Sequence, residues 1–222
     1  MEPQKKTLIF ADRDGTITKD ENYYLGSNEN WKEQIEFLPG VVEGIRLLNQ
    51  ISNHYFFIVT NQSGVALRGG RFDLLTEERM HEVNKYIIEK LNEKELTING
   101  YFACPFVDNK YVEKAQKKGR ELNSEYISDS HPDLKPKPGM INNALKSLNL
   151  QKEDCLIFMI GDRASDVETG INAGGIGILI ESSKTKELGD KEKVEKMKNT
   201  FVARDFLHAT DYILNILNED NN

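Results

Sequence analysis

The feature that most constrains this 222-residue chain is the regular alternation of short apolar runs with amphipathic segments. The apolar runs are 7–11, 55–59, 98–104, 155–160 and 176–180, with 201–202 as a candidate edge strand. The runs have the length of buried strands, and apolar residues recur at helical spacing in segments such as 41–51, 76–91 and 205–217. Such alternation is typical of a parallel sheet with crossover helices. We therefore predict an α/β fold with a mostly parallel central sheet, helices on both faces and one domain spanning 1–222.

The segment 105–136 interrupts this alternation. It is polar, rich in lysine and without a clear period, and it is long for a connection within a compact domain. We predict an irregular insertion loop that is either functional or mobile. The intervals after Asp14 and after Thr60 are too short for a large cap domain, so we expect none. The charged segment 182–198 is predicted to be a solvated helix.

Composition excludes several classes of protein. Thirty-six Asp and Glu against 29 Lys and Arg give no support for a nucleic-acid footprint. The first residues precede no apolar stretch of signal-peptide length, and no run is long enough to span a membrane. Cys104 and Cys155 lie far apart in the sequence, as expected for reduced, buried thiols. We predict a cytoplasmic monomer without membrane or nucleic-acid partners.

Two aspartates follow the first apolar run directly. Side chains two apart on an extended segment point the same way, so Asp12 and Asp14 are expected to project together, with Arg13 turned aside. Gly15 then lets the backbone turn sharply. Two adjacent carboxylates repel unless a cation lies between them, and Mg²⁺ is a common partner of such pairs. The alternative is a strand end whose aspartates are simply solvated.

Four polar clusters fall at the ends of predicted strands or just before predicted helices. They are Asp12 with Asp14, Thr60 with Asn61, Lys137, and Asp162 with Asp166. Ligands bind at the carboxyl ends of strands in open α/β sheets, so these clusters are expected to meet. Together they supply the nucleophile, the acid/base, the metal ligands and the phosphoryl-binding groups that phosphoryl transfer requires. Taken singly, each also has a simpler interpretation as a turn, a helix cap or an exposed lysine.

The four clusters resemble the four motifs of the haloacid dehalogenase (HAD) phosphohydrolases, over a region from Asp12 to about residue 180. The strings that carry the resemblance are Asp12-Arg13-Asp14-Gly15-Thr16-Ile17, Phe37-Leu38-Pro39-Gly40-Val41, Thr60-Asn61-Gln62-Ser63-Gly64-Val65, Lys137-Pro138 with Met140, and Gly161-Asp162-Arg163 with Ser165-Asp166. Within the superfamily they look most like the group of heptose-bisphosphate and histidinol-phosphate phosphatases. The implied fold is the three-layer Rossmann-like HAD fold.

The resemblance implies a mechanism for the hydrolysis of a small phosphorylated metabolite, such as a heptose bisphosphate or histidinol phosphate. Asp12 would attack phosphorus and form an aspartyl-phosphate, while Asp14 would act first as acid and then as base. Thr60 and Asn61 would hold phosphoryl oxygens, and Lys137 would neutralise charge in the transition state.

The resemblance also implies a Mg²⁺ site and a set of substrate contacts. Asp12, the backbone carbonyl of Asp14, and Asp162 would bind the metal, with Asp166 behind them. The substrate contacts would come from Asp20, Tyr23, Thr60, Asn61, Gln62, Ser63, Lys137 and Arg163.

The chain departs from the resembled group in two places. That group usually has a small zinc site formed by Cys-x-His and, just before the motif lysine, Cys-x-Cys. Here Cys104 is kept, but Phe106 replaces the histidine, and Asp133 and Lys135 occupy the second cysteine pair. We expect no structural zinc, although His131 and Asp133 remain conceivable partners of Cys104.

The second departure concerns substrate recognition. Pro136 stands where the group tends to have an arginine, while the insertion carries several cations of its own. They are Lys110, Lys114, Lys117, Lys118 and Arg120. These side chains form either a solvated loop or a second anion site for a bisphosphate.

Two other functions stay open at this point. The 3′-phosphatase part of polynucleotide kinase-phosphatases has similar strings, but the chain is acidic and contains no kinase P-loop. A non-catalytic phosphate-binding relative is the other alternative, although a binding module has no need for an acid/base carboxyl at position 14.

Overall fold

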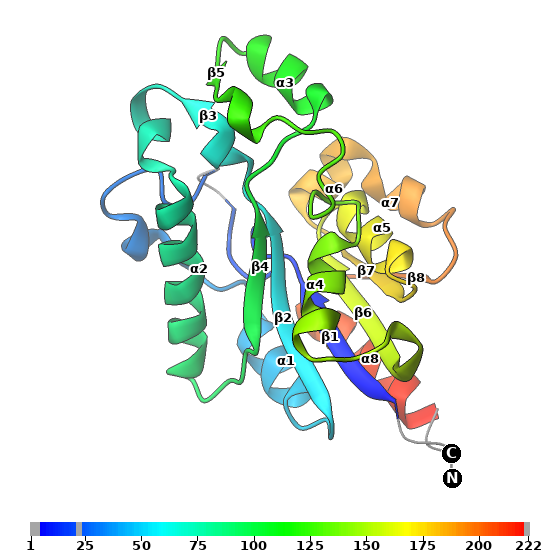
Figure 1. Ribbon diagram of the computed structural model, residues 1–222. Helices are drawn as coiled ribbons and strands as arrows, with labels where there is room; N and C mark the ends of the chain where they lie inside the picture. The colour runs from blue at the N-terminus through cyan, green and yellow to red at the C-terminus, as the bar shows by residue number, and fades with distance from the viewer. Residues whose placement is uncertain (1–4, 21–23, 220–222) are drawn as a thin grey trace.

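The protein forms a central six-stranded sheet in which every neighbouring pair of strands is parallel (Figure 1). The computed structural model describes residues 5–20 and 24–219. The strand order is β4-β2-β1-β6-β7-β8, so the first strand lies in the middle of the sheet. This confirms the predicted parallel α/β fold, and the predicted edge strand at 201–202 lies within β8.

The elements of secondary structure follow the predicted alternation. The strands of the large sheet are β1 (Lys6–Ala11), β2 (His54–Asn61), β4 (Gly100–Cys104), β6 (Cys155–Gly161), β7 (Ile176–Ile180) and β8 (Thr200–Ala203). The helices are α1 (Val41–Leu48), α2 (Glu77–Asn92), α3 (Asn109–Gln116), α4 (Gly139–Ser147), α5 (Ala164–Asn172), α6 (Ser183–Leu188), α7 (Asp190–Val194) and α8 (Phe206–Glu219). Short 3-10 helices lie at Trp31–Gln34, Ser63–Ala66, Gly70–Leu74, Ser124–Tyr126 and Lys152–Asp154.

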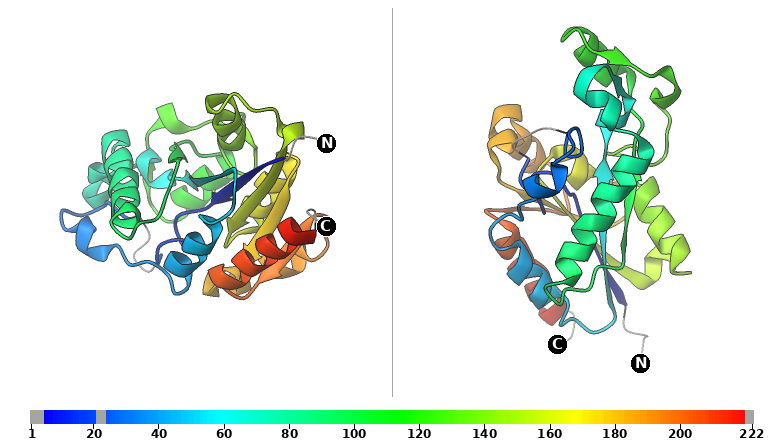
Figure 2. Two further views of the ribbon diagram at one scale, coloured as in Figure 1. Left: turned by 90° about the horizontal axis from the view of Figure 1, so that it is seen from below. Right: turned by 90° about the vertical axis from the view of Figure 1, so that its left-hand side faces the viewer.

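Strand β1 is apolar throughout because both of its faces are covered. Ile9 and Ala11 belong to a core that also contains buried residues of α1, α2 and α8. Leu8 and Phe10 point to the opposite face and pack in a second core with residues of α4. Figure 2 shows α1 and α8 on one side of the sheet and α4 on the other. A strand buried on both faces reads as a continuous hydrophobic run, which is the pattern of 7–11.

The strand order reverses at β1. From β1 the chain proceeds to β2 and β4 on one side of the sheet, and then returns to β6 on the other side. The carboxyl ends of β1 and β6 therefore flank a topological switch point, where open α/β sheets bind ligands. Asp12 follows β1 and Asp162 follows β6, so two of the predicted clusters meet at this point.

The insertion at 105–136 is more ordered than its composition predicts. It contains helix α3 and strand β5 (Glu121–Leu122), which pairs antiparallel with β3 (Leu67–Arg68) in a small second sheet. Asp108 caps α3 by accepting a hydrogen bond from the Tyr111 backbone at 2.7 Å. The prediction of an irregular loop is therefore wrong for these elements. Figure 1 shows α3, β3 and β5 standing beyond the carboxyl ends of β2 and β4.

The segment 182–198 also differs from its prediction. It forms two short helices, α6 and α7, which are separated by Gly189 in a left-handed conformation. Thr185, Asp190 and Val194 are buried in these helices, so the segment is not a solvated helix but part of the packed structure. Among the described residues, no helix has the length and apolar character needed to cross a bilayer.

Candidate active site

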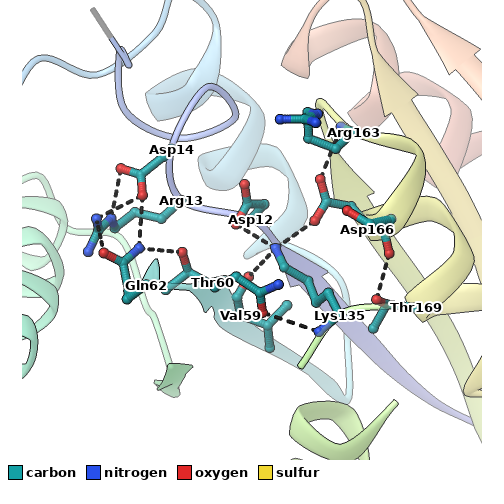
Figure 3. Close-up of polar contacts among 12 residues, drawn as sticks. Asp12, Arg13, Asp14, Val59, Thr60, Gln62, Lys135, Arg163, Asp166 and Thr169 are labelled. Atoms are coloured by element: carbon teal, nitrogen blue, oxygen red, sulfur yellow. Dashed lines mark hydrogen bonds and ion pairs between the residues drawn. The ribbon is translucent and has the colours of Figure 1, made fainter. Parts of the chain in front are cut away.

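A buried lysine joins two aspartates at the centre of the carboxyl edge (Figure 3). The Lys135 Nζ donates hydrogen bonds to Asp12 Oδ1 at 2.7 Å and to Asp166 Oδ1 at 2.5 Å. It also contacts the Val59 carbonyl oxygen at 3.3 Å. All three charged side chains are nearly inaccessible to solvent, so the lysine charge is balanced by the two carboxylates rather than by water.

The site lysine is thus Lys135, and the prediction that Lys137 joins the cluster is wrong. Lys137 Nζ donates instead to the backbone carbonyls of Asp129 and His131. The resemblance assigned the motif lysine to the Lys137-Pro138 pair, but the chain has a second such pair two residues earlier, Lys135-Pro136. The backbone here forms a turn, closed by a hydrogen bond from the Lys137 N–H to the Leu134 carbonyl. The sequence pattern does not distinguish the two lysines, and only the course of the turn shows which one enters the site.

Three buried carboxylates form the one group among the described residues with the arrangement of a metal site. Asp12, Asp162 and Asp166 each offer an oxygen, and these atoms lie within 4.8 Å of one another. Gly15 makes room for them, because a Cβ at this position would lie 2.6 Å from Asp162 Oδ2. The φ of Gly15 is +85°, a conformation that L-residues with a side chain rarely adopt. Both features require glycine at this turn.

The electrostatics of this group favour a bound cation. Burial, together with the neighbouring Asp166 and Asp12, raises the pKa of Asp162 to about 8. Burial also raises the pKa of Asp12 to about 6, although Lys135 opposes the shift. Burial alone would lower the pKa of Lys135, but the charges of Asp12 and Asp166 outweigh it and raise that pKa. A divalent cation would relieve the repulsion that these carboxylates experience.

Asp14 belongs to a different network from Asp12. The buried Arg13 donates to Asp14 Oδ1 at 3.0 Å from Nε and to Oδ2 at 2.8 Å from Nη2. The amide of Gln62 donates to Asp14 Oδ2 at 2.9 Å, and Arg13 is held in turn by Asn84 and Gln62. Burial alone would raise the pKa of Asp14, but the charge and hydrogen bonds of Arg13 lower it.

This network corrects the predicted direction of Arg13. The chain leaves the extended conformation after Asp12, so Arg13 is not turned aside but folds back onto Asp14. Figure 3 shows the Arg13, Asp14 and Gln62 group beside the Lys135 group rather than within it.

The end of β2 provides the predicted hydroxyl and amide groups. Thr60 is buried, and its Oγ1 accepts a hydrogen bond from Gln62 at 2.8 Å. Asn61 Oδ1 accepts from the Lys135 backbone at 3.2 Å, which links β2 to the turn that carries the lysine. Thr60, Asn61, Gln62 and Ser63 all line the same cavity as Asp12.

Two of the remaining predicted substrate residues line the cavity but pair with charged residues outside the Lys135 cluster. Asp20 lines the cavity and forms an ion pair with Lys184 of α6, a residue that the sequence did not single out. Arg163 also lines the cavity, but its Nε pairs with Asp190 at 3.3 Å. Tyr23 lies outside the described residues. Lys184 has no motif around it, so only the packing of α6 reveals its place.

The N-cap residue of α6 and a residue in its first turn hold Asp162. Ser182 Oγ donates to Asp162 Oδ2 at 3.1 Å, and Thr185 Oγ1 donates to the Asp162 carbonyl oxygen at 2.8 Å. Their polar character is consistent with an ordinary N-cap, so nothing in the sequence links them with the site.

The site opens into a cavity of about 690 Å³. Its floor contains the carboxylates and Lys135, and its walls come from the insertion, from α6 and from the loop after β2. A cavity of this size accommodates a small metabolite.

Moving the motif lysine from 137 to 135 also shifts the predicted zinc positions by two residues. The two cysteine positions then fall on His131 and Asp133, and the arginine position falls on Leu134. Cys104 Sγ is 3.8 Å from His131 Nδ1, while the His131 ring stacks on Phe106 with centroids 3.9 Å apart. Burial raises the pKa of the Cys104 thiol to about 11, which favours the protonated form. The absence of a structural zinc stays a prediction.

Together the fold and the site define a phosphoryl-transfer enzyme of the α/β class. Residues 134–209 match a family model described as HAD-hydrolase-like. The chain is 32% identical over 177 residues to the D-glycero-beta-D-manno-heptose-1,7-bisphosphate 7-phosphatase of Rhodopseudomonas palustris, covering 80% of this chain and 84% of that protein. It is 30% identical to the enzyme of the same name from Pasteurella multocida, with coverages of 76% and 77%. The chain belongs to the HAD superfamily and is a phosphatase.

Solved structures agree with this assignment of the fold. The D,D-heptose 1,7-bisphosphate phosphatase of B. bronchiseptica, solved with magnesium and phosphate, has a TM-score of 0.69 at 19% identity and covers 95% of this chain and 99% of its own. A HAD-like phosphatase from Mesorhizobium loti has a TM-score of 0.62 at 28% identity, with coverages of 82% and 75%.

Proposed function

We propose that the protein is a Mg²⁺-dependent phosphomonoesterase that acts through an aspartyl-phosphate at Asp12. The observation that supports this most strongly is the contact of Lys135 Nζ with both Asp12 and Asp166. The lysine lies where it can balance charge on the nucleophile and on the phosphoryl group that the nucleophile receives.

The reaction has two halves. In the first, a carboxylate oxygen of Asp12 forms a bond to phosphorus, and the bond from phosphorus to the ester oxygen breaks. In the second, a water oxygen forms a bond to the same phosphorus, and the aspartyl oxygen–phosphorus bond breaks. Inorganic phosphate and the free Asp12 carboxylate result. Thr60 and the backbone amide of Asn61 are suited to hold phosphoryl oxygens in both halves.

Asp14 is the acid/base of this proposal. It would give a proton to the departing ester oxygen in the first half and take one from the attacking water in the second. Arg13 and Gln62 favour its ionised form, which is the base form. Substrate binding therefore has to accompany a change in the contacts of Asp14 before it serves as the acid.

The residues present fit a magnesium ion. Asp12 and Asp162, with the backbone carbonyl of Asp14, would bind it, and Asp166 would lie beside it and orient Lys135. The ion supplies a positive charge that lessens the repulsion between the nucleophile and the phosphate dianion. The raised pKa values of Asp12 and Asp162 support this assignment, since burial and the neighbouring carboxylates outweigh the positive charge that Lys135 brings to Asp12 and Arg163 to Asp162.

The substrate we favour is a heptose 1,7-bisphosphate or a closely related sugar bisphosphate. The curated relatives carry that name, and the cavity is large enough for a phosphorylated sugar. Leu134 stands where the resembled group has an arginine, so this chain has to recognise part of the substrate differently. We retain the predicted cytoplasmic monomer as part of the proposal.

The test is phosphate release from a panel of esters, with and without Mg²⁺. The panel contains D-glycero-beta-D-manno-heptose 1,7-bisphosphate, histidinol phosphate, other sugar phosphates and a 3′-phosphorylated oligonucleotide. We expect Mg²⁺-dependent release from the heptose ester by the wild-type protein and none by Asp12→Asn. Preference for the oligonucleotide would contradict the proposed substrate class, and normal release by Asp12→Asn would contradict the mechanism.

A further inference from the structure

One wall of the cavity is strongly basic and takes no part in the mechanism above. Arg71 comes from the 3-10 helix after β3, Lys114 from α3, and Lys118 and Arg120 from the turn before β5. We call these four residues the α3 wall. None of them forms an ion pair within 4.0 Å with a carboxylate of the described residues. Four cations facing one cavity without counterions repel one another, so an anion bound there is favoured.

Arg120 is held in place by aromatic rings rather than by an acid. Its Nη1 donates to the Tyr24 hydroxyl at 2.7 Å, and its guanidinium carbon lies 5.4 Å from the ring centroids of both Tyr24 and Phe72. Such contacts fix the position of the guanidinium but leave its charge unneutralised. The remaining N–H groups of the planar Arg120 guanidinium are suited to donate to the oxygens of a phosphate.

Hydrogen bonds connect this arginine to two tyrosines that line the same cavity as the phosphate-binding turn. The Tyr24 hydroxyl lies 3.1 Å from that of Tyr111, and both tyrosines line the cavity together with Ser63. Ser63 follows the Thr60 and Asn61 pair that is assigned to the transferred phosphoryl group. The α3 wall and the catalytic floor therefore belong to one continuous cavity and not to two separate surfaces.

The carboxylates near the α3 wall do not cancel its charge. Asp108 lines the cavity, but it is the cap of α3 and accepts from the Tyr111 backbone. Asp20 pairs with Lys184 on the side formed by α6, where Glu187 also lines the cavity. The α3 wall thus carries a positive excess that faces the bound substrate.

We propose that the α3 wall binds the second phosphate of a bisphosphorylated sugar, the phosphate that is not transferred. This inference rests on the proposed function, because it assumes that the other phosphate lies at Asp12. It explains how the chain recognises a bisphosphate although Leu134 replaces the arginine of its relatives. It also gives the part of the insertion from α3 to β5 a function in substrate selection.

The test compares a bisphosphate with a monophosphate in matched variants. The first variant is Arg71→Gln/Lys114→Gln/Lys118→Gln, which leaves the ring contacts of Arg120 intact. The control is Lys110→Gln/Lys117→Gln, which removes one charge from α3 and one from the residue that follows it, neither of which lines the cavity. The readout is kcat/KM for heptose 1,7-bisphosphate and for heptose 7-phosphate.

We expect the triple variant to lose roughly 10- to 100-fold on the bisphosphate, as for the loss of charge-assisted hydrogen bonds. Its activity on the monophosphate should stay within about twofold, as should both activities of the control. Equal losses on the two esters, or no loss on the bisphosphate, would overturn the proposal.

A binding measurement separates this proposal from the proposed function. Calorimetry in the Asp12→Asn background gives the Kd of heptose 1,7-bisphosphate without turnover. If the triple substitution weakens binding and the control does not, the second phosphate site is supported even where the wild-type protein hydrolyses neither ester. Unchanged binding, or no binding at all, would overturn it.

Discussion

The floor and the α3 wall of the cavity are built in opposite ways. On the floor, Asp12, Asp166 and Lys135 are nearly fully buried and pair with one another. On the wall, Lys114, Lys118 and Arg71 are exposed, and no described carboxylate pairs with them. Asp12 of the floor directly follows the buried strand β1, whereas three of the four wall residues belong to the insertion and Arg71 belongs to the 3-10 helix after β3.

The difference indicates a division of labour. Charges that must be held at fixed positions for bond making lie buried at the carboxyl edge of the sheet, where they hold one another in ion pairs. Charges that select a substrate by its net charge tolerate exposure and side-chain freedom. Substitutions on the floor should therefore affect turnover or stability strongly, and those on the wall should affect substrate preference.

The largest expected effect distinguishes the two lysines of the turn before α4. Lys135→Met should lower kcat by roughly 10²–10³-fold, because a buried electrostatic donor next to the nucleophile is lost. Lys137→Met, the matched control, should change kcat by no more than about threefold, since its amine contacts backbone carbonyls away from the cluster. Steady-state measurement of kcat for both variants on one phosphate ester tests this prediction. A larger loss of kcat for Lys137→Met would contradict the assignment of Lys135 as the site lysine.

The second effect concerns the ion pair between the buried Arg13 and the partly exposed Asp14. Arg13→Met should lower the free energy of unfolding by about 2 kcal/mol, because it leaves Asp14 without its cationic partner. Lys19→Met, which breaks the exposed pair with Glu36, should cost less than about 1 kcal/mol. Urea unfolding monitors both variants. Similar losses in the two would show that burial of the Arg13 pair matters little.

The third effect is a pH dependence of the metal-free protein. The pKa of Asp162 is about 8 in the folded state against an ordinary 3.8, so the folded state binds its proton more tightly. Its contribution to stability should therefore fall as pH rises from 3.8 to about 8. Asp162→Asn should flatten this slope and stabilise the metal-free protein at the alkaline end by at least ~1 kcal/mol.

Unfolding curves with EDTA at several pH values measure this effect. Added Mg²⁺ should stabilise the wild-type protein more than Asp162→Asn. Parallel pH curves for the two proteins would contradict the assignment of Asp162 as a strained metal ligand.

The smallest effect belongs to the wall. Tyr24→Phe removes the hydroxyl that accepts from Arg120, so KM for the bisphosphate should rise about threefold while kcat is unchanged. Tyr126→Phe is the matched control, because its hydroxyl donates to Glu77 outside the cavity. A fall in kcat for Tyr24→Phe, with no change for the control, would show that Tyr24 acts on the transferred phosphoryl group and not on the second phosphate.

The fold was predictable because its signals are local. Continuous apolar runs such as 7–11 follow from burial on both faces of a sheet, and the carboxyl-edge rule then brings Asp12 and Asp162 together. The errors lie where neighbours in space, rather than in sequence, decide the conformation. The turn that begins at Leu134 directs Lys135 into the site, although the sequence pattern had assigned that position to Lys137. Arg13 is held against Asp14 with the help of a hydrogen bond to Asn84, 71 residues away.

The most direct test of the account is a burst experiment with Asp14→Asn and p-nitrophenyl phosphate, whose leaving group departs without a proton. The account predicts rapid release of about one equivalent of nitrophenolate per site, followed by slow turnover, because the acyl-phosphate forms but its hydrolysis lacks a base. Mass spectrometry of the quenched protein should then place a hydroxylamine-sensitive phosphate on Asp12. Steady release without a burst, together with no phosphate on Asp12, would contradict the proposed covalent mechanism.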